Sequence, residues 1–174
     1  ATFPTKCVKV VGDISERYSW IGDMDEVNDE LYQDALVIVL DTGAEKLISD
    51  ERYNTGAFLI KMDHHYPQGE YGDLAYVDTT RESCAGVVAK FLIEKRFKLN
   101  EKAATALFVG MVTDSGRFRY SSTNSETYRL ASELMKYKID TEAIYNKIYV
   151  DKLANVKLKA KLIDKFVVLD SGVA

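Results

Sequence analysis

Hydrophobic residues in the first half of the chain are grouped in short runs that are typical of β-strands. Four such runs occupy residues 7–12, 35–40, 58–62 and 74–77, and each ends at or beside a glycine or an aspartate. The run at 35–40 contains no polar residue, which predicts a strand buried on both faces, as in a parallel sheet. Residues 13–33 are richer in acids and predict a loop with short helix.

After residue 80 the spacing of hydrophobic residues changes to that of helices. Apolar residues recur every three or four positions in four stretches, namely 85–92, 103–111, 128–135 and 153–163. Asn100 is suited to cap the second of these helices, and Thr123-Asn124-Ser125-Glu126 matches a capping box that opens the third. Asp140 is expected to cap one more helix. This order of elements predicts an α/β fold with a mostly parallel sheet flanked by helices.

Composition limits the class of protein. A chain of 174 residues, 47% hydrophobic and 29% charged, is expected to form one globular domain. No apolar stretch approaches the ~20 residues of a membrane span. The net charge of −4 offers no general attraction to nucleic acid, so a polyanionic substrate would need local divalent cations. Cys7 and Cys84 lie far apart and predict reduced thiols in a cytosolic protein.

Candidate chemistry lies where the predicted strands end. The only two histidines, His64 and His65, follow the third strand together with Asp63, and Asp41 follows the second. Because ligands of open α/β sheets bind beyond the carboxyl ends of the strands, these side chains are expected at one sheet edge. Asp114 lies in a glycine-flanked segment after the second helical stretch. Carboxylates with an imidazole are ligands for Mn²⁺, Fe²⁺ or Zn²⁺, and a carboxylate-rich set favours Mn²⁺ or Mg²⁺.

Each of these residues also has a simpler interpretation. Asp41 is as well suited to be a helix cap or a turn residue, and Asp114 precedes Ser-Gly as turn residues do. The histidine pair could be surface polar side chains. Joint placement at the ends of neighbouring strands is what favours a metal site over these separate interpretations.

Three blocks of sequence resemble the DHH phosphoesterase superfamily. Asp63-His64-His65, with Leu40-Asp41-Thr42 upstream and residues 112–118 downstream, is similar to its second, third and fourth motifs in order and spacing. The branch that the chain resembles most is that of the bacterial oligoribonucleases and 3′-phosphoadenosine-5′-phosphate (pAp) phosphatases. The similarity extends over nearly the whole chain.

The resemblance implies a site with two Mn²⁺ ions. Asp41 would bridge both metals, and His64 and Asp114 would complete the second metal site. His65 would face the scissile phosphate, and Asp63 would be a carboxylate that orients a histidine.

The implied function is a Mn²⁺-dependent phosphoesterase that hydrolyses short oligoribonucleotides or pAp through a metal-bound hydroxide. Arg117 is a candidate phosphate contact, and a solvated loop charge is the equally simple interpretation. A cytoplasmic protein, short RNA or a small nucleotide phosphate as partner, and a homodimer are the accompanying expectations. The alternatives are a cyclic dinucleotide phosphodiesterase, a family II pyrophosphatase, a catalytically degenerate nucleotide-binding module and a plain structural domain.

The chain departs from the family pattern in several places. The first motif, His-x-x-Pro-Asp-x-Asp, is absent, so residues 1–150 are expected to be a catalytic domain that begins after it. Residues 151–174 are expected to be a linker helix leading to a C-terminal substrate-binding domain, and the chain alone is expected to be inactive or nearly so. Asp23-Met24-Asp25 lacks the preceding His and Pro of the motif and predicts a solvated loop. Gly86 stands where relatives often carry Glu.

Overall fold

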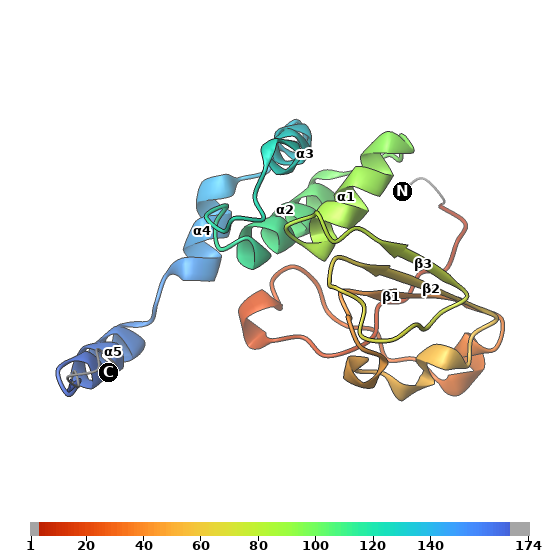
Figure 1. Cartoon of the computed structure of the whole chain (residues 1–174), viewed down its shortest axis with the longest axis horizontal. Coiled ribbons are helices and arrows are strands. Elements are labelled where there is room, and N and C mark those ends of the chain that lie inside the picture. Colours follow the sequence, from red (N-terminus) through yellow and green to blue (C-terminus); the bar gives the residue numbers. More distant parts are fainter. Residues whose placement is uncertain (1–3, 168–174) are drawn as a thin grey trace. The chain divides into compact units, whose positions relative to one another are not determined.

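Three parallel strands form the sheet of this α/β protein (Figure 1). The structure is a computed structural model that describes residues 4–167. Strands β1 (Leu36–Leu40), β2 (Phe58–Asp63) and β3 (Leu74–Val77) lie in the order β1-β2-β3, and both pairings are parallel. The predicted parallel sheet and three of its four predicted strands are thereby confirmed.

The register of the sheet brings two acidic residues to the same edge. Leu40, the last residue of β1, lies opposite Met62 of β2. The next residue, Asp41, donates its backbone N–H to the Met62 carbonyl at 3.1 Å, and Asp63 ends β2. Parallel pairing therefore places the carboxyl ends of β1 and β2, and the polar residues that follow them, side by side.

Three helices belong to the same compact unit as the sheet. They are α1 (Cys84–Glu94), α2 (Glu101–Asp114) and α3 (Ser125–Met135). Helix α1 contacts β2, and the three helices contact one another, on one side of the sheet in Figure 1. The fully buried core between them includes Val87, Met111, Val112, Leu130 and Leu134. Asn100 caps α2 as predicted, accepting the Ala103 N–H at 2.8 Å.

The remaining elements are short or lie in a second unit. Four 3-10 helices precede or follow β1, at Glu16–Tyr18, Asp29–Tyr32, Glu45–Leu47 and Glu51–Asn54. A second compact unit begins after Asp140 and contains α4 (Thr141–Tyr149) and α5 (Leu153–Ile163). The domain division predicted between residues 150 and 151 stays a prediction. Among residues 4–167, no helix has the length and hydrophobicity needed to cross a membrane.

The strand prediction for residues 7–12 was wrong. The Val10 N–H donates to the Asp25 side chain at 2.9 Å, and the Val10 carbonyl accepts the Asp25 N–H at 2.6 Å. The backbone of Val10 is therefore bound by a loop and does not pair with a strand. Asp23-Met24-Asp25 lies in a loop, as expected, and Asp25 there also pairs with the partly exposed Lys9 at 2.9 Å.

Strand β1 differs from its prediction in burial. Leu36, Ile38 and Leu40 are each about half exposed, although an all-apolar run predicted burial on both faces. These three residues alternate along the strand and lie on one face, whereas Val39 on the opposite face is buried. Among the described residues β1 also pairs with β2 alone, so it is an edge strand. The hydrophobicity of the run indicated a strand, but not that one face of it is left uncovered.

The capping box of α3 is shifted by one residue from its prediction. Asn124, not Thr123, caps the helix, and its side chain accepts the backbone N–H groups of Glu126 and Thr127. Thr127 completes the box by accepting the Asn124 N–H, whereas Glu126 instead binds Arg129 on the helix surface. Thr127 is thereby held in the buried first turn of α3.

Candidate metal centre

His64 and two aspartates from separate elements meet at the carboxyl edge of the sheet. The Nε2 atom of His64 lies 3.5 Å from Asp41 Oδ1 and 3.1 Å from Asp114 Oδ2. Asp41 follows β1, His64 follows β2, and Asp114 is the last residue of α2. The convergence of these three residues, predicted from the sequence, is confirmed, whereas their role as metal ligands stays a prediction.

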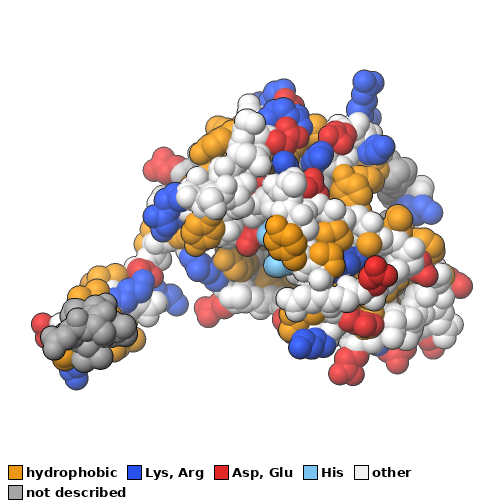
Figure 2. All heavy atoms as spheres, viewed as in Figure 1, with side chains coloured by type: hydrophobic (Ala, Val, Ile, Leu, Met, Phe, Trp, Pro, Cys, Tyr) orange, Lys and Arg blue, Asp and Glu red, His pale blue; other side chains and the backbone are white. Residues whose placement is uncertain are grey.

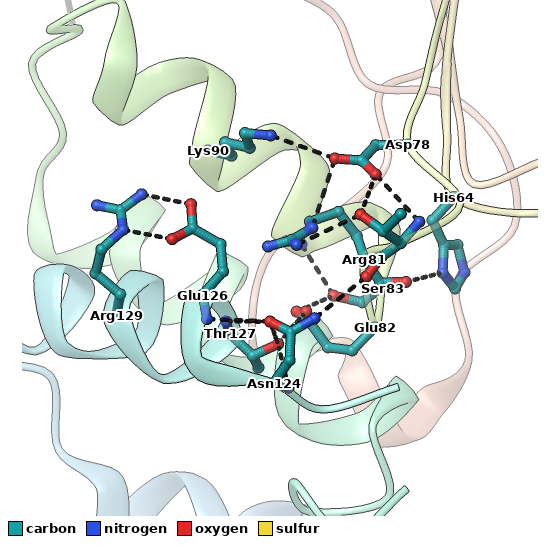
Figure 3. Close-up of polar contacts among 12 residues, drawn as sticks. His64, Asp78, Arg81, Glu82, Ser83, Lys90, Asn124, Glu126, Thr127 and Arg129 are labelled. Atoms are coloured by element: carbon teal, nitrogen blue, oxygen red, sulfur yellow. Dashed lines mark hydrogen bonds and ion pairs between the residues drawn. The ribbon is translucent and has the colours of Figure 1, made fainter. Parts of the chain in front are cut away.

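The second ring nitrogen of His64 fixes which nitrogen faces the aspartates. Nδ1 lies 3.3 Å from the backbone carbonyl of Arg81, and a carbonyl oxygen only accepts hydrogen bonds (Figure 3). Nδ1 therefore carries a proton. In the neutral imidazole the lone pair is then on Nε2, which is the arrangement of a histidine that binds a metal.

The residues present fit a divalent cation. His64 Nε2 is buried and has no hydrogen-bond partner, although it faces two carboxylate oxygens. Ligand atoms about 2.1 Å from one ion, at angles of about 90–110°, are about 3.0–3.4 Å apart. The two measured separations are close to that range. Asp41, His64 and His65 also offer one ligand atom each within 4.8 Å of one another.

Crowded negative charge at the site also favours a bound cation. The pKa of the Asp114 carboxyl is raised above its usual value because burial disfavours the ionised form and because the Asp41 carboxylate repels it, while His64 partly offsets both effects. Such repulsion is what a bound cation would remove. Figure 2 shows histidine at the surface of this face, with acidic and hydrophobic side chains around it.

Asp63 is fully buried beneath these residues and holds His65. Its Oδ1 accepts the His65 Nδ1–H at 2.8 Å and the backbone N–H groups of His64 and His65 at 2.8 and 3.2 Å. Burial raises the pKa of the Asp63 carboxyl, but these hydrogen bonds outweigh burial and leave the pKa below its usual value. The contact with the half-exposed ring of His65 has the geometry expected if Asp63 orients that histidine.

Two residues that contact Asp63 and the turn after Asp41, Lys61 and Tyr71, were not predicted from the sequence. The Lys61 ammonium, almost completely buried, lies 3.5 Å from Asp63 Oδ2 and donates to the Gly43 carbonyl at 3.3 Å. It also lies 4.4 Å from the ring centre of Tyr71, whose hydroxyl donates to the Thr42 carbonyl at 2.5 Å. Both residues thereby fix the turn that follows Asp41. Residues two apart in a strand lie on the same face, so the position of Lys61 two residues before Asp63 was the signal that could have placed it beside Asp63.

A pocket opens beside the two aspartates. It has a volume of about 300 Å³ and is lined by Tyr18, Asp41, Ser83, Cys84, Ala85, Gly110, Thr113 and Asp114. The Cys84 thiol donates to the Met62 carbonyl at 3.2 Å, and burial raises its pKa to about 12. Cys84 is therefore a neutral thiol near neutral pH, which disfavours it as a thiolate ligand.

Arg117 lies in the turn after α2. It is exposed and has a positive φ of 66°, and its N–H donates to the Val112 carbonyl at 2.8 Å. Its predicted contact with phosphate stays a prediction.

The pH dependence of His65 follows from its bond to Asp63. This hydrogen bond raises the pKa of His65 above the reference value of 6.5, against the lowering effect of burial. Because the folded-state pKa is raised, its stabilising contribution is complete below about pH 6.5 and is lost as the pH rises through the folded pKa. In the metal-free protein, NMR titration of the His65 ring should show this raised pKa, and Asp63→Asn should lower it.

The control for this titration is Asp151→Asn, which removes an exposed carboxylate from the second compact unit. It should leave the His65 titration unchanged. Equal pKa values for His65 in the parent and in Asp63→Asn would contradict the assignment of the Asp63 bond as the cause.

Comparison with known proteins agrees with this geometry. A family profile described as "DHH family, N-terminal domain" matches residues 4–111. The chain belongs to the DHH family. The DHH tripeptide of the matched region is Asp63-His64-His65, so the residues at the centre of the site are those for which the family is named.

Individual relatives give the same result. The chain is 40% identical over its full length to "Probable bifunctional oligoribonuclease and PAP phosphatase NrnA" of Streptococcus mutans, and 37% identical over 99% of its length to the NrnA of Bacillus subtilis. It spans only 56% of the length of each of these DHH relatives. Among solved structures, an exopolyphosphatase-related protein of Bacteroides fragilis matches with a TM-score of 0.73 and 27% identity, covering 81% of this chain and 44% of that protein.

Proposed function

We propose that this DHH chain is the catalytic part of a Mn²⁺-dependent phosphoesterase that hydrolyses short oligoribonucleotides and pAp. The observation that carries the proposal is the convergence of His64 with Asp41 and Asp114. The substrate class is supported by the similarity to the Streptococcus mutans and Bacillus subtilis relatives, which are described as oligoribonucleases and PAP phosphatases. Manganese is proposed because two carboxylates and one imidazole form an oxygen-rich ligand set.

In this proposal Asp41, His64 and Asp114 hold the metal, and Asp41 is shared with a second ion. When bound, the metals would supply positive charge to the phosphoryl oxygens and would acidify water. The chain's own contribution is orientation. The Arg81 carbonyl orients the ring of His64, and Asp63 orients the ring of His65.

His65 is proposed to contact the substrate. Asp63 binds its Nδ1, so Nε2 is the nitrogen available for a phosphoryl oxygen. The raised pKa of His65 keeps the ring protonated to a higher pH, and a protonated ring donates a hydrogen bond to the charge that develops on that oxygen. Arg117, from the turn after α2, is a second proposed phosphate contact.

The same proposal includes the organisation of the longer protein. Residues 1–150 are proposed as the catalytic domain and residues 151–174 as a linker helix to a substrate-binding domain. A cytoplasmic location and a homodimer are also proposed for the longer protein.

The test is hydrolysis by a chimera that joins this chain to the parts of the Streptococcus mutans relative that the match does not cover. Release of phosphate from pAp, and of mononucleotides from di- and triribonucleotides, should require Mn²⁺ and stop with EDTA. His64→Ala should abolish activity, and His65→Ala should reduce kcat by about 10²–10³-fold, as is usual for the loss of one group that stabilises transition-state charge.

Parallel assays with pyrophosphate and cyclic di-AMP identify the substrate class. Faster turnover of either compound than of pAp would replace the proposed substrate within the same chemistry. Binding of pAp without turnover of any of these compounds would favour a catalytically degenerate nucleotide-binding module. An exposed substitution, Lys136→Ala, is the matched control and should leave every rate unchanged.

A further inference from the structure

The loop between β3 and α1 determines how His64 is held. This loop, residues 78–83, carries the Arg81 carbonyl that lies 3.3 Å from His64 Nδ1. Because that carbonyl accepts a hydrogen bond from Nδ1–H, its position fixes the orientation of the His64 ring and directs Nε2 toward the aspartates. Whatever anchors the 78–83 loop therefore acts on the nitrogen that faces Asp41 and Asp114.

Glu82 anchors the loop from inside the protein. Its side chain is buried, and its two carboxylate oxygens accept the hydroxyls of Ser83 at 3.0 Å and Thr127 at 2.7 Å (Figure 3). Ser83 is the N-cap of α1, where its hydroxyl oxygen also accepts the Gly86 N–H at 2.9 Å. Glu82 thus links the first turns of α1 and α3 immediately beside Arg81.

A second contact holds the loop on the other side of Arg81. Asn124, the N-cap of α3, donates its side-chain amide to the Thr80 carbonyl at 3.4 Å. Figure 3 shows the Arg81 guanidinium directed toward Asp78, away from the His64 ring. The charged end of Arg81 therefore has its own partner, and it is the backbone of Arg81 that serves His64.

Gly86 provides the space for the Glu82 carboxylate. A Cβ atom at position 86 would overlap Glu82 Oε1 and would lie 3.1 Å from Glu82 Cδ. The carboxylate could move away only by losing hydrogen bonds that it makes in a buried position. Glycine is normally less favourable than alanine inside a helix. The space that the Glu82 carboxylate occupies explains why glycine stands at position 86 of α1.

We infer that Glu82 is a positioning residue for the metal centre, and that Gly86 is required for it. Glu82 holds the 78–83 loop so that the Arg81 carbonyl binds Nδ1 of His64 and keeps Nε2 directed toward Asp41 and Asp114. This inference rests on the proposed role of His64 as a metal ligand, although the position of the ring is a property of the metal-free protein.

The test uses the fact that the chain has only two histidines. ¹H–¹⁵N NMR of the metal-free protein reports whether the Nδ1–H of each ring is hydrogen-bonded and slow to exchange, and His65→Asn identifies the His64 signals. The parent should show a hydrogen-bonded His64 Nδ1–H. Glu82→Ala and Gly86→Ala should each weaken that hydrogen bond and weaken Mn²⁺ binding by about 10–100-fold, as for other groups that orient metal ligands.

Two further variants separate positioning from general stability. In the Glu82→Ala background, Gly86→Ala should have no further effect, because the group that it displaces is already gone. Glu82→Gln, which retains one acceptor oxygen, should keep most of the His64 Nδ1–H hydrogen bond and of the Mn²⁺ affinity. Glu133→Ala removes a partly exposed acid from the surface of α3 and should change neither reading.

The outcomes distinguish this inference from the proposed function. If Glu82→Ala and Gly86→Ala lower the melting temperature but leave the His64 Nδ1–H hydrogen bond and the Mn²⁺ affinity unchanged, Glu82 is only a buried structural acid and the inference fails. Should Glu82→Ala not fold, Gly86→Ala and Glu82→Gln decide by the same two readings. A parent that shows the expected hydrogen bond but binds no Mn²⁺ would overturn the metal site and leave the positioning of His64 by Glu82 intact.

Discussion

Mn²⁺ is expected to raise the melting temperature of this chain, and the rise should disappear in His64→Ala and in Asp114→Asn. The carboxylates of Asp41 and Asp114 converge on His64, and a cation that binds only this folded arrangement stabilises it by mass action. At a hundredfold excess of Mn²⁺ over its dissociation constant, the stabilisation is about 2.7 kcal/mol. For a protein of this size that corresponds to roughly 5–11 °C.

Thermal melts with and without Mn²⁺, followed by circular dichroism, measure this effect. Lys136→Ala is the control, because Lys136 is exposed at the C-terminal end of α3, where its ammonium pairs with Glu133 at 2.6 Å. The control should keep the full rise. An equal shift in all four proteins would mean nonspecific binding of ions, and the ligand set of Asp41, His64 and Asp114 would have to be abandoned.

Lys61→Met is expected to be the most destabilising substitution near the site. Lys61 and Asp63 are both buried, and their charged atoms lie 3.5 Å apart. Methionine fills a similar volume but leaves the Asp63 carboxylate without the ammonium. Removal of one partner of a buried ion pair typically costs about 3–5 kcal/mol, because the other charge is left uncompensated.

Urea denaturation of the metal-free protein measures this cost. Lys136→Met makes the same chemical change at an exposed position and should alter the free energy of unfolding by less than about 1 kcal/mol. The double variant Lys61→Met with Asp63→Asn should recover part of the loss, since the uncompensated charge is removed. A cost for Lys61→Met no larger than that of the exposed control would show that Asp63 does not depend on Lys61.

The parts of the site that follow strands could be predicted from the sequence. A run of apolar residues followed by an acid indicates a strand and its end, and parallel pairing then brings Asp41 and Asp63 to one edge without knowledge of the side-chain contacts. Asp114 joins them through the packing of α2, which no local pattern determines. Its assignment rested on the resemblance to the DHH superfamily.

Other features could not be predicted because their causes are distant in the sequence. Glu82 stands in a polar segment that gives no sign of burial, and its partner Thr127 is 45 residues away. The strand expected at residues 7–12 failed because Asp25 binds the backbone of Val10. Apolar residues alone could not distinguish a segment that pairs in a sheet from one whose backbone groups are bound by a loop.

The open edge of β1 has a consequence for handling the protein. Leu36, Ile38 and Leu40 present half-exposed apolar side chains on a strand that, among residues 4–167, pairs on one side only. An unprotected edge of this kind is a template for strands of other molecules, and it carries neither proline nor lysine to discourage them. Concentrated samples of this chain should therefore lose material to self-association through β1, and dilute solutions are the better starting point for spectroscopy.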